Sequence, residues 1–331
     1  MTVLQQLLTA TITLATVFFF GSAGEIITQK SGHLNLGAPG IVALGGLGGA
    51  IGESFYVNSI GITANPNPFL AVLIAIMFSL LFGALGGLIF SFFTVSLRCN
   101  QNVVGLCLTT FGVAFTGFFF TNSSLLNFDR LADAAVYFKS MGFPGQVTSD
   151  LPFLVEVLFS HGFLTYFAIL VCIVAGFIIN RTKLGLAIRA TGENPAAADS
   201  MGINVKRIRY GSTIVGSMIT SLAGLQIVMV LAGGAGLAEM GSEMETLGWL
   251  ALSIVIFSMW KPGFAIIGSL IFSFFYKLPQ VITGLTATGE IALKMLPYIL
   301  TIVVLIITSI IKVKSSKAPN ALGTNYFRED R

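Results

Sequence analysis

Charge is scarce in this sequence. Only 10% of the 331 residues are Asp, Glu, Lys or Arg, whereas 55% are hydrophobic. A soluble domain carries about 25% charged residues, which cover its surface. The widest charge-free run extends from 54 to 97. About 20 apolar residues cross a bilayer core as a helix, and a charge near the centre costs about 3 kcal/mol. The chain is therefore predicted to be a polytopic membrane protein, which excludes a soluble globular domain, a secreted disulfide scaffold and a disordered chain.

Cysteine and histidine are also scarce. Cys99, Cys107 and Cys172 lie in or beside apolar stretches and lack the CxxC spacing of zinc or redox sites. The two histidines, His33 and His161, belong to no HExxH motif and no Cys/His cluster. No metal site and no cofactor are therefore expected. Since no other catalytic cluster stands out, an integral-membrane enzyme is the least favoured class of function.

The chain lacks the residues that would let it drive transport alone. It contains no GxxxxGK[ST] sequence, so no P-loop ATP site is expected. Ion-coupled carriers usually place acids or histidines inside their spans. Here Glu25 and Glu53 lie at predicted span ends, and Glu290 lies in an ambiguous segment. If the protein moves a solute uphill, we expect a partner to supply the energy.

The apolar stretches predict an all-α transmembrane helical bundle. The first stretch is interpreted as a retained span, because no basic residue precedes it as in a signal peptide. The segment 279–295 is ambiguous, so we expect eight to ten spans. Residues 1–312 are expected to form one transmembrane domain, and 313–331 a C-terminal tail. The nine candidate spans are 3–23, 37–54, 69–97, 102–121, 158–180, 210–232, 247–260, 263–278 and 296–312.

Alternation of these spans places most basic residues on one side. The loop 181–209 and the loops on its side carry 14 of the 18 basic residues, and nine of the 14 acids fall on the other side. Short loops rich in Lys and Arg remain in the cytoplasm. The loop 181–209 and the C-terminus are therefore expected in the cytoplasm and the N-terminus outside.

Glycine is concentrated in one stretch. Seven glycines lie within Leu36–Gly52, including GxxxG pairs. Small residues at this spacing let transmembrane helices approach closely, but broken helices in transporters are also rich in glycine. The density favours a broken or re-entrant helix near 37–54, with ordinary close packing as the alternative.

The loop 181–209 contains a short helix with both ends marked. Asn194 is a good N-cap, and Pro195 suits the first helical position. Gly202 can adopt the left-handed conformation that ends a helix. The pattern predicts a two-turn helix that a partner protein grips, with Arg189 and Glu193 adding polar contacts. The alternative is a solvated loop with no partner.

Two groups of residues form recognisable motifs. One group, in the loop 181–209, is Gly185, Arg189-Ala190, Gly192-Glu193-Asn194, Ala197-Ala198 and Gly202-Ile203. The other, near the N-terminus, is Gly24-Glu25, Ser31-Gly32, Leu34-Asn35-Leu36-Gly37 and Gly40. Both groups resemble one known family, the permeases of ATP-binding-cassette (ABC) importers for branched-chain amino acids, ribose-type sugars and nucleosides, in which the first group forms the coupling loop. The N-terminal group is most similar to nucleoside (purine-type) permeases, although Lys30 and Pro39 depart from that pattern.

The resemblance implies a permease subunit in the plasma membrane of a bacterium, which is not itself an enzyme. It forms half of a translocation pore for a small polar solute, most simply a nucleoside. Its expected partners are an ABC ATPase subunit, a second and related permease subunit, an extracytoplasmic substrate-binding lipoprotein and membrane lipid, with no nucleic acid polymer. The residues expected to couple to the ATPase are Arg189, Gly192, Glu193, Asn194, Ala197, Ala198 and Gly202.

Four further residues are candidates for the translocation pathway. Glu25 and Asn35 supply polar groups near the first two spans, and Phe111 and Phe115 could face a nucleobase. The alternative for Glu25 and Asn35 is that they fix the bend between the two spans. The alternative for the whole protein is a stand-alone secondary transporter or channel for a small solute, which would need no ATPase.

Overall fold

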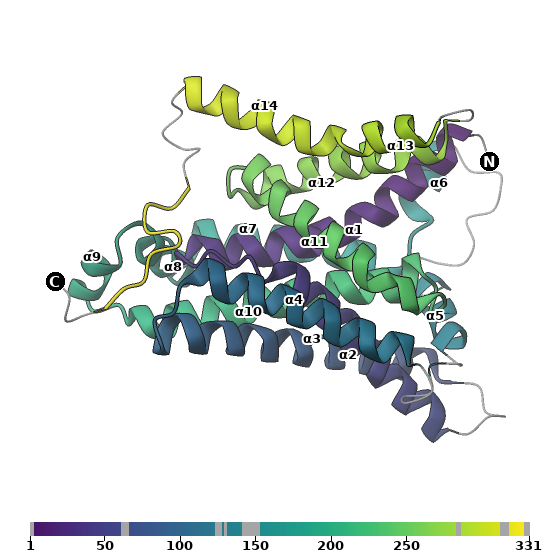
Figure 1. The fold of residues 1–331 in the computed structure, drawn as a ribbon, viewed down its shortest axis with the longest axis horizontal. Coiled ribbons are helices and arrows are strands. Elements are labelled where there is room, and N and C mark those ends of the chain that lie inside the picture. The colour runs from purple at the N-terminus through teal and green to yellow at the C-terminus, as the bar shows by residue number, and fades with distance from the viewer. Residues whose placement is uncertain are drawn as a thin grey trace.

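The computed structural model of the chain describes residues 3–60, 66–122, 128, 131–140, 153–282, 286–311 and 318–327. Every regular element in these ranges is a helix (Figure 1), which confirms the predicted all-α bundle. Eight helical segments found there are long and apolar enough to cross a membrane. They are α1 (Val3–Lys30), α2 (Ala38–Ser59), α3 (Pro68–Ser91) with η1 (Phe92–Ser96), α4 (Gln101–Thr121), α7 (Phe163–Arg181), α10 (Val205–Gln226) with η4 (Ile227–Leu231), η5 (Leu237–Glu239) with α11 (Met240–Phe257), and α12 (Pro262–Lys277) with η6 (Leu278–Gln280).

The last helix, α14 (Leu296–Ile311), adds a ninth candidate crossing. It has 16 residues, which is roughly 24 Å of helix, and it runs along the bundle in Figure 1. The predicted range of eight to ten spans is therefore met. The short helices are α5 (Leu131–Ser140), α6 (Phe153–Phe159), α8 (Lys183–Glu193), α9 (Pro195–Ser200) and α13 (Ala287–Lys294).

Burial separates the centre of the bundle from its outer surface. α2 packs against α3 and α10, and α1 packs against α10 and α12. Phe18, Phe19 and Phe20 of α1 are at most 1% exposed, whereas Leu81 of α3 and Phe177 of α7 are 52% and 62% exposed. Large apolar side chains on an outer face would be unfavourable in water, so these faces are suited to lipid.

The glycine-rich stretch does not break a helix. The prediction of a broken or re-entrant element near 37–54 is wrong, because α2 is one continuous helix of 22 residues. The glycines of α2 instead allow this helix to cross α10 at close range. A Cβ on Gly45 would collide with the backbone of Ser221 in α10, and a Cβ on Gly224 of α10 would collide with the Val42 carbonyl group. The stretch is therefore an ordinary helix that packs closely through small residues, which was the alternative interpretation of the sequence.

Successive long helices alternate in direction, so the connections gather at two ends of the bundle (Figure 1). We name one of them the α9 end. It holds α8, α9, the connections 31–37, 97–100 and 258–261, and the segment 318–327. The start of α1 lies at the opposite end, together with α5, α6 and α13 (Figure 1).

Basic residues gather at the α9 end, as the span order predicts. Within the described part of the chain, the opposite end carries only Lys139, Lys277 and Lys294. The α9 end carries Lys30, Arg98, Arg181, Lys183, Arg189, Lys206, Arg207, Arg209 and Lys261.

Candidate functional site

The connection between α7 and α10 is mostly helical. Thr182 caps α8, since its hydroxyl oxygen accepts a hydrogen bond from the Gly185 N–H at 3.1 Å. Asn204 caps α10 in the same way through the Arg207 N–H at 3.0 Å. The α8 helix was not predicted, because only the second helix of the loop has unambiguous start and stop signals.

The predicted two-turn helix is confirmed as α9. The Asn194 side chain accepts a hydrogen bond from the Ala197 N–H at 3.0 Å, as an N-cap should. Gly202 has φ of +85°, and the Ile203 N–H donates to the Ala198 carbonyl oxygen at 3.0 Å. This is the glycine-ended C-cap that the sequence indicated. The helix is therefore held rigidly at both ends.

The seven predicted coupling residues divide between two faces. Glu193, Asn194, Ala197 and Gly202 are exposed, whereas Gly192 and Ala198 are buried and Arg189 is half-buried. The exposed residues can touch a partner directly, and the buried ones can only position them.

The most exposed residue of this surface was not predicted from the sequence. Met201 follows α9 and is 83% exposed, so the tip of the loop is apolar. A large apolar residue directly before the helix-ending Gly202 is the signal that could have identified it, because a side chain there projects beyond the last turn.

The C-terminal segment was also missed. The tail 313–331 was expected only to be cytoplasmic. Of it, 318–327 is described and lies against the α9 end (Figure 1). The Ala321 N–H donates to the Gly192 carbonyl oxygen at 2.9 Å, so this segment touches the predicted coupling residues directly.

Glu25 and Asn35 are brought together. The Asn35 Nδ2 donates to Glu25 Oε1 at 3.0 Å, and Asn35 Oδ1 accepts from the Gly37 N–H at 2.9 Å. Both side chains are 0% exposed. This arrangement closes the turn between α1 and α2, which favours the alternative that the pair fixes the bend.

A pair of substitutions separates the structural role from the pathway role. Glu25→Gln keeps an acceptor for Asn35, so we expect wild-type uptake. Asn35→Leu removes the donor to Glu25 Oε1 and leaves Gln29 as the side-chain partner of this buried residue, so we expect a loss of about 1–3 kcal/mol of stability. Thermal unfolding in detergent and uptake by cells measure the two effects. Loss of uptake in a well-folded Glu25→Gln protein would instead assign Glu25 to the pathway.

The two candidate aromatic residues lie on α4. Phe111 is 52% exposed and stacks on Phe115 with ring centroids 5.3 Å apart. Because Phe111 points away from the body of the chain, it faces lipid or another protein. A pathway role for it stays a prediction that requires a second chain against α4.

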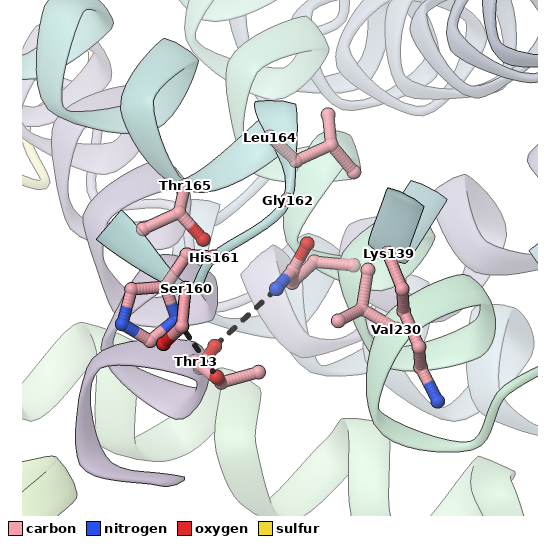
Figure 2. A pocket seen from close by; sticks show the side chains of 9 residues that line it. Thr13, Lys139, Ser160, His161, Gly162, Leu164, Thr165 and Val230 are labelled. Atoms are coloured by element: carbon pink, nitrogen blue, oxygen red, sulfur yellow. Dashed lines mark hydrogen bonds between the residues drawn. The ribbon is translucent and has the colours of Figure 1, made fainter. Parts of the chain in front are cut away.

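Figure 2 shows a polar pocket that was not predicted from the sequence. The Gln226 Nε2 donates to the Thr13 carbonyl oxygen at 3.3 Å, and His161 Nδ1 lies 3.3 Å from Thr13 Oγ1. Gln226 Oε1 is buried and has no hydrogen-bond partner among the described residues. The pocket holds about 210 Å³ and is lined by Thr13, Lys139, Ser160, His161, Gly162, Leu164, Thr165, Gln226 and Val230.

Both histidines are buried. Burial, together with Arg209, lowers the pKa of His33 well below its usual value, and burial lowers the pKa of His161. Each imidazole is therefore neutral at pH 7. In the ranges that the structure covers, no three His, Cys, Asp or Glu residues could hold a metal ion.

Comparison with known proteins gives three kinds of finding. A family model described as "Branched-chain amino acid transport system / permease component" matches residues 7–308. The chain is 28% identical over 322 residues to the nucleoside ABC transporter permease protein NupC of Lactococcus lactis, covering 95% of this chain and 94% of that protein. It is 30% identical over 334 residues to the guanosine ABC transporter permease protein NupQ of Bacillus subtilis, covering 99% and 98%.

A third relative carries a different substrate in its name. It is the putative glucose ABC transporter permease protein TsgC13 of Haloferax volcanii, 31% identical over 268 residues, which cover 80% of this chain and 74% of that protein. No solved structure gives a significant match.

Proposed function

The chain belongs to the family of branched-chain amino acid transport permease components, and from this premise we propose that it is the membrane subunit of an ABC importer for nucleosides. It is a transport subunit, and a separate ATPase supplies the energy. The observation that carries the substrate class is near full-length similarity to two permeases named for nucleoside and guanosine transport. Similarity to a permease named for glucose makes a sugar the second candidate.

The proposed orientation rests on charge. Nine basic residues of the described ranges lie at the α9 end and three at the opposite end. Because short loops rich in Lys and Arg stay inside, the α9 end faces the cytoplasm and α1 begins outside. The protein then sits in the plasma membrane with its C-terminus inside. In this orientation an ABC ATPase reaches α9, and an extracytoplasmic binding lipoprotein meets the opposite end.

The mechanism follows from the rigidity of α9. Closure of the ATPase on ATP would move α9 and the helices attached to it, and a second permease subunit would move in the opposite sense. The bundle would then change from outward-open to inward-open by rigid-body motion. Gly192 supports the transmission of this motion, since a Cβ there would collide with the Lys30 carbonyl group at the end of α1. The loop before α9 and the first span therefore have no room to slide independently.

The polar pocket suits a neutral solute. Its hydrogen-bonding groups are hydroxyls, an amide and a neutral imidazole, with Lys139 as the charged group of the lining. Nucleosides are uncharged and rich in donors and acceptors, so groups such as Gln226 Oε1 can pair with them. Hydrogen bonds between neutral groups would also suit a sugar, so competition between solutes is needed to distinguish a nucleoside from a sugar as the substrate.

The test is uptake by cells that lack the chromosomal copy of this permease and carry it on a plasmid. Labelled guanosine is the probe, and unlabelled nucleosides, sugars and branched-chain amino acids are the competitors. We expect only nucleosides to suppress uptake. Suppression by glucose or leucine, with guanosine uptake unchanged by other nucleosides, would contradict the proposed substrate class.

Gln226 provides a residue-level prediction for the pocket. Gln226→Leu keeps the volume of the side chain and removes its amide. We expect the KM for nucleoside uptake to rise about tenfold, equivalent to about 1.4 kcal/mol, with little change in folded protein. Ser79→Ala is the control, because Ser79 is a buried hydroxyl that donates to the Ser221 carbonyl oxygen away from the pocket. An unchanged KM in Gln226→Leu would exclude the pocket from the pathway.

A further inference from the structure

The segment 318–327, named the strap here, contacts several helices that are distant in sequence. It contains a turn in which the Thr324 N–H and hydroxyl both donate to the Ala321 carbonyl oxygen, at 3.2 and 2.8 Å. Gly323 in this turn has φ of +78°, a conformation that favours glycine. The strap is therefore a shaped segment and not an extended tail.

One set of strap contacts lies near the two ends of α9. The Asn320 Nδ2 donates to Glu193 Oε2 at 2.8 Å, directly before α9. The Tyr326 hydroxyl donates to Asp199 Oδ2 at 3.0 Å, near the end of α9. Among the helices, α9 packs mainly against its chain neighbours α8 and α10. The strap thus adds side-chain hydrogen bonds near both ends of α9 to the packing of α9 against α8 and α10.

A second set reaches α1 and α10. The Gly323 N–H donates to the Gly32 carbonyl oxygen at 3.1 Å, in the connection that follows α1. Arg209 of α10 donates through Nη1 to the Thr324 carbonyl oxygen at 3.0 Å. Arg209 is only 3% exposed, so this charge is enclosed where the strap meets α10.

A third set fixes the connection between α3 and α4. The Asn325 Nδ2 donates to the carbonyl oxygens of Arg98 and Cys99, at 2.7 and 3.2 Å. The Arg98 guanidinium lies 3.3 Å from the ring centroid of Phe327. Arg98 has φ of +57°, which is uncommon for a residue other than glycine. The strap therefore stabilises an unusual backbone conformation in the connection between α3 and α4, at the α9 end.

We propose that the strap is a tie that carries the motion of α9 to the ends of α1, α3, α4 and α10. Without the strap, α9 can still bind a partner, but the chain segments before and after α9 absorb its displacement. This rests on the proposed function, since it assumes that an ATPase moves α9. The strap then acts in coupling rather than in recognition of the ATPase, and its side chains are positioning residues.

The experiment uses the complete importer, reconstituted with its ATPase, second permease and binding protein. Asn325→Ala removes the contacts to the α3–α4 connection, and Tyr326→Phe removes only the bond to Asp199. Deletion of 318–331 removes the strap. Asn122→Ala is the matched control, because Asn122 is an exposed asparagine that donates to the Phe118 carbonyl oxygen at the opposite end.

The readout is the number of guanosine molecules imported per ATP hydrolysed, together with the amount of ATPase that co-purifies. We expect at least a fivefold fall in this ratio for Asn325→Ala, a smaller fall for Tyr326→Phe, and near-complete loss for the deletion, with unchanged ATPase recovery. Asn122→Ala should match the wild type. If the deleted chain cannot be recovered, the two single substitutions still decide the matter. A wild-type ratio in both, or loss of the ATPase from the complex, would overturn the proposal.

A second measurement tests the strap without any transport. In a Cys107→Ser background, needed because Cys107 is exposed, labelling of the half-buried Cys99 by a maleimide should be faster in the deletion variant than in the full chain, because Asn325 fixes the backbone at Arg98 and Cys99. Equal labelling rates in the two variants would show that the strap does not bind the α3–α4 connection, and would overturn the proposal that it carries the motion of α9. Failure of the proposed function gives a different result, namely no ATP-dependent uptake in the wild-type complex while the difference in Cys99 labelling remains.

Discussion

Met201→Glu is expected to abolish ATP-driven uptake while leaving the amount of folded permease unchanged. Met201 is 83% exposed beyond α9, so the fold gains little from its side chain. If α9 docks on the ATPase as proposed, a carboxylate at this tip would be enclosed in the interface. An unpaired buried charge costs about 3–5 kcal/mol, which is more than a hundredfold in binding. Co-purification of the ATPase and cellular uptake measure the two consequences.

Val136→Glu is the control for this substitution. Val136 is 58% exposed on α5 at the opposite end of the bundle, so it also places a carboxylate where an exposed apolar side chain stood. It should leave ATPase binding unchanged. Normal uptake and normal ATPase recovery in Met201→Glu would remove the tip of α9 from the docking surface.

Gly224→Val is expected to have the largest effect on stability. The crossing of α2 and α10 leaves no space for a side chain, because a Cβ at Gly224 would collide with the Val42 carbonyl group and approach the Gly46 backbone nitrogen. Both obstacles are backbone atoms of a central helix, so neither can rotate away. Overpacking of a core costs about 1–3 kcal/mol, and a rigid backbone obstacle favours the upper end of this range.

Gly211→Val separates this steric effect from the general effect of valine in a helix. Gly211 also lies in α10, but apart from its own helix no atom of the described residues lies within 4 Å of a Cβ added there. Size-exclusion chromatography after heating measures both variants. We expect Gly224→Val to lose its monodisperse peak at a clearly lower temperature than the wild type, and Gly211→Val to remain close to it. Equal melting of the two variants would mean that the crossing is looser than described.

The parts of the fold that the sequence predicted are those with local causes. Hydropathy over about 20 residues marks a span wherever it occurs, so the bundle and the alternation of its ends were predictable. The caps of α9 depend on Asn194 and Gly202, which act within one or two turns. Both features could be derived without knowledge of any neighbouring helix.

The parts that the sequence did not predict depend on contacts between distant segments. The glycines of α2 could equally break a helix or pack one, and only the position of Ser221 against Gly45 decides between these outcomes. The pocket joins Thr13, His161 and Gln226, which share no sequence spacing. The strap binds the side chains of Glu193, Asp199 and Arg209 as well as backbone carbonyl groups, all far from it in the sequence, so no local pattern marks these contacts.

The most direct measurement is guanosine uptake by proteoliposomes under two energy sources. We predict that liposomes holding this chain, its second permease subunit and the ATPase take up guanosine from its binding protein only when the ATPase has ATP, and that Met201→Glu removes this uptake. An ion gradient across liposomes that contain this chain alone should drive none. Gradient-driven uptake by the chain alone, indifferent to ATP and to Met201→Glu, would contradict the coupling role of α9 and indicate a stand-alone transporter.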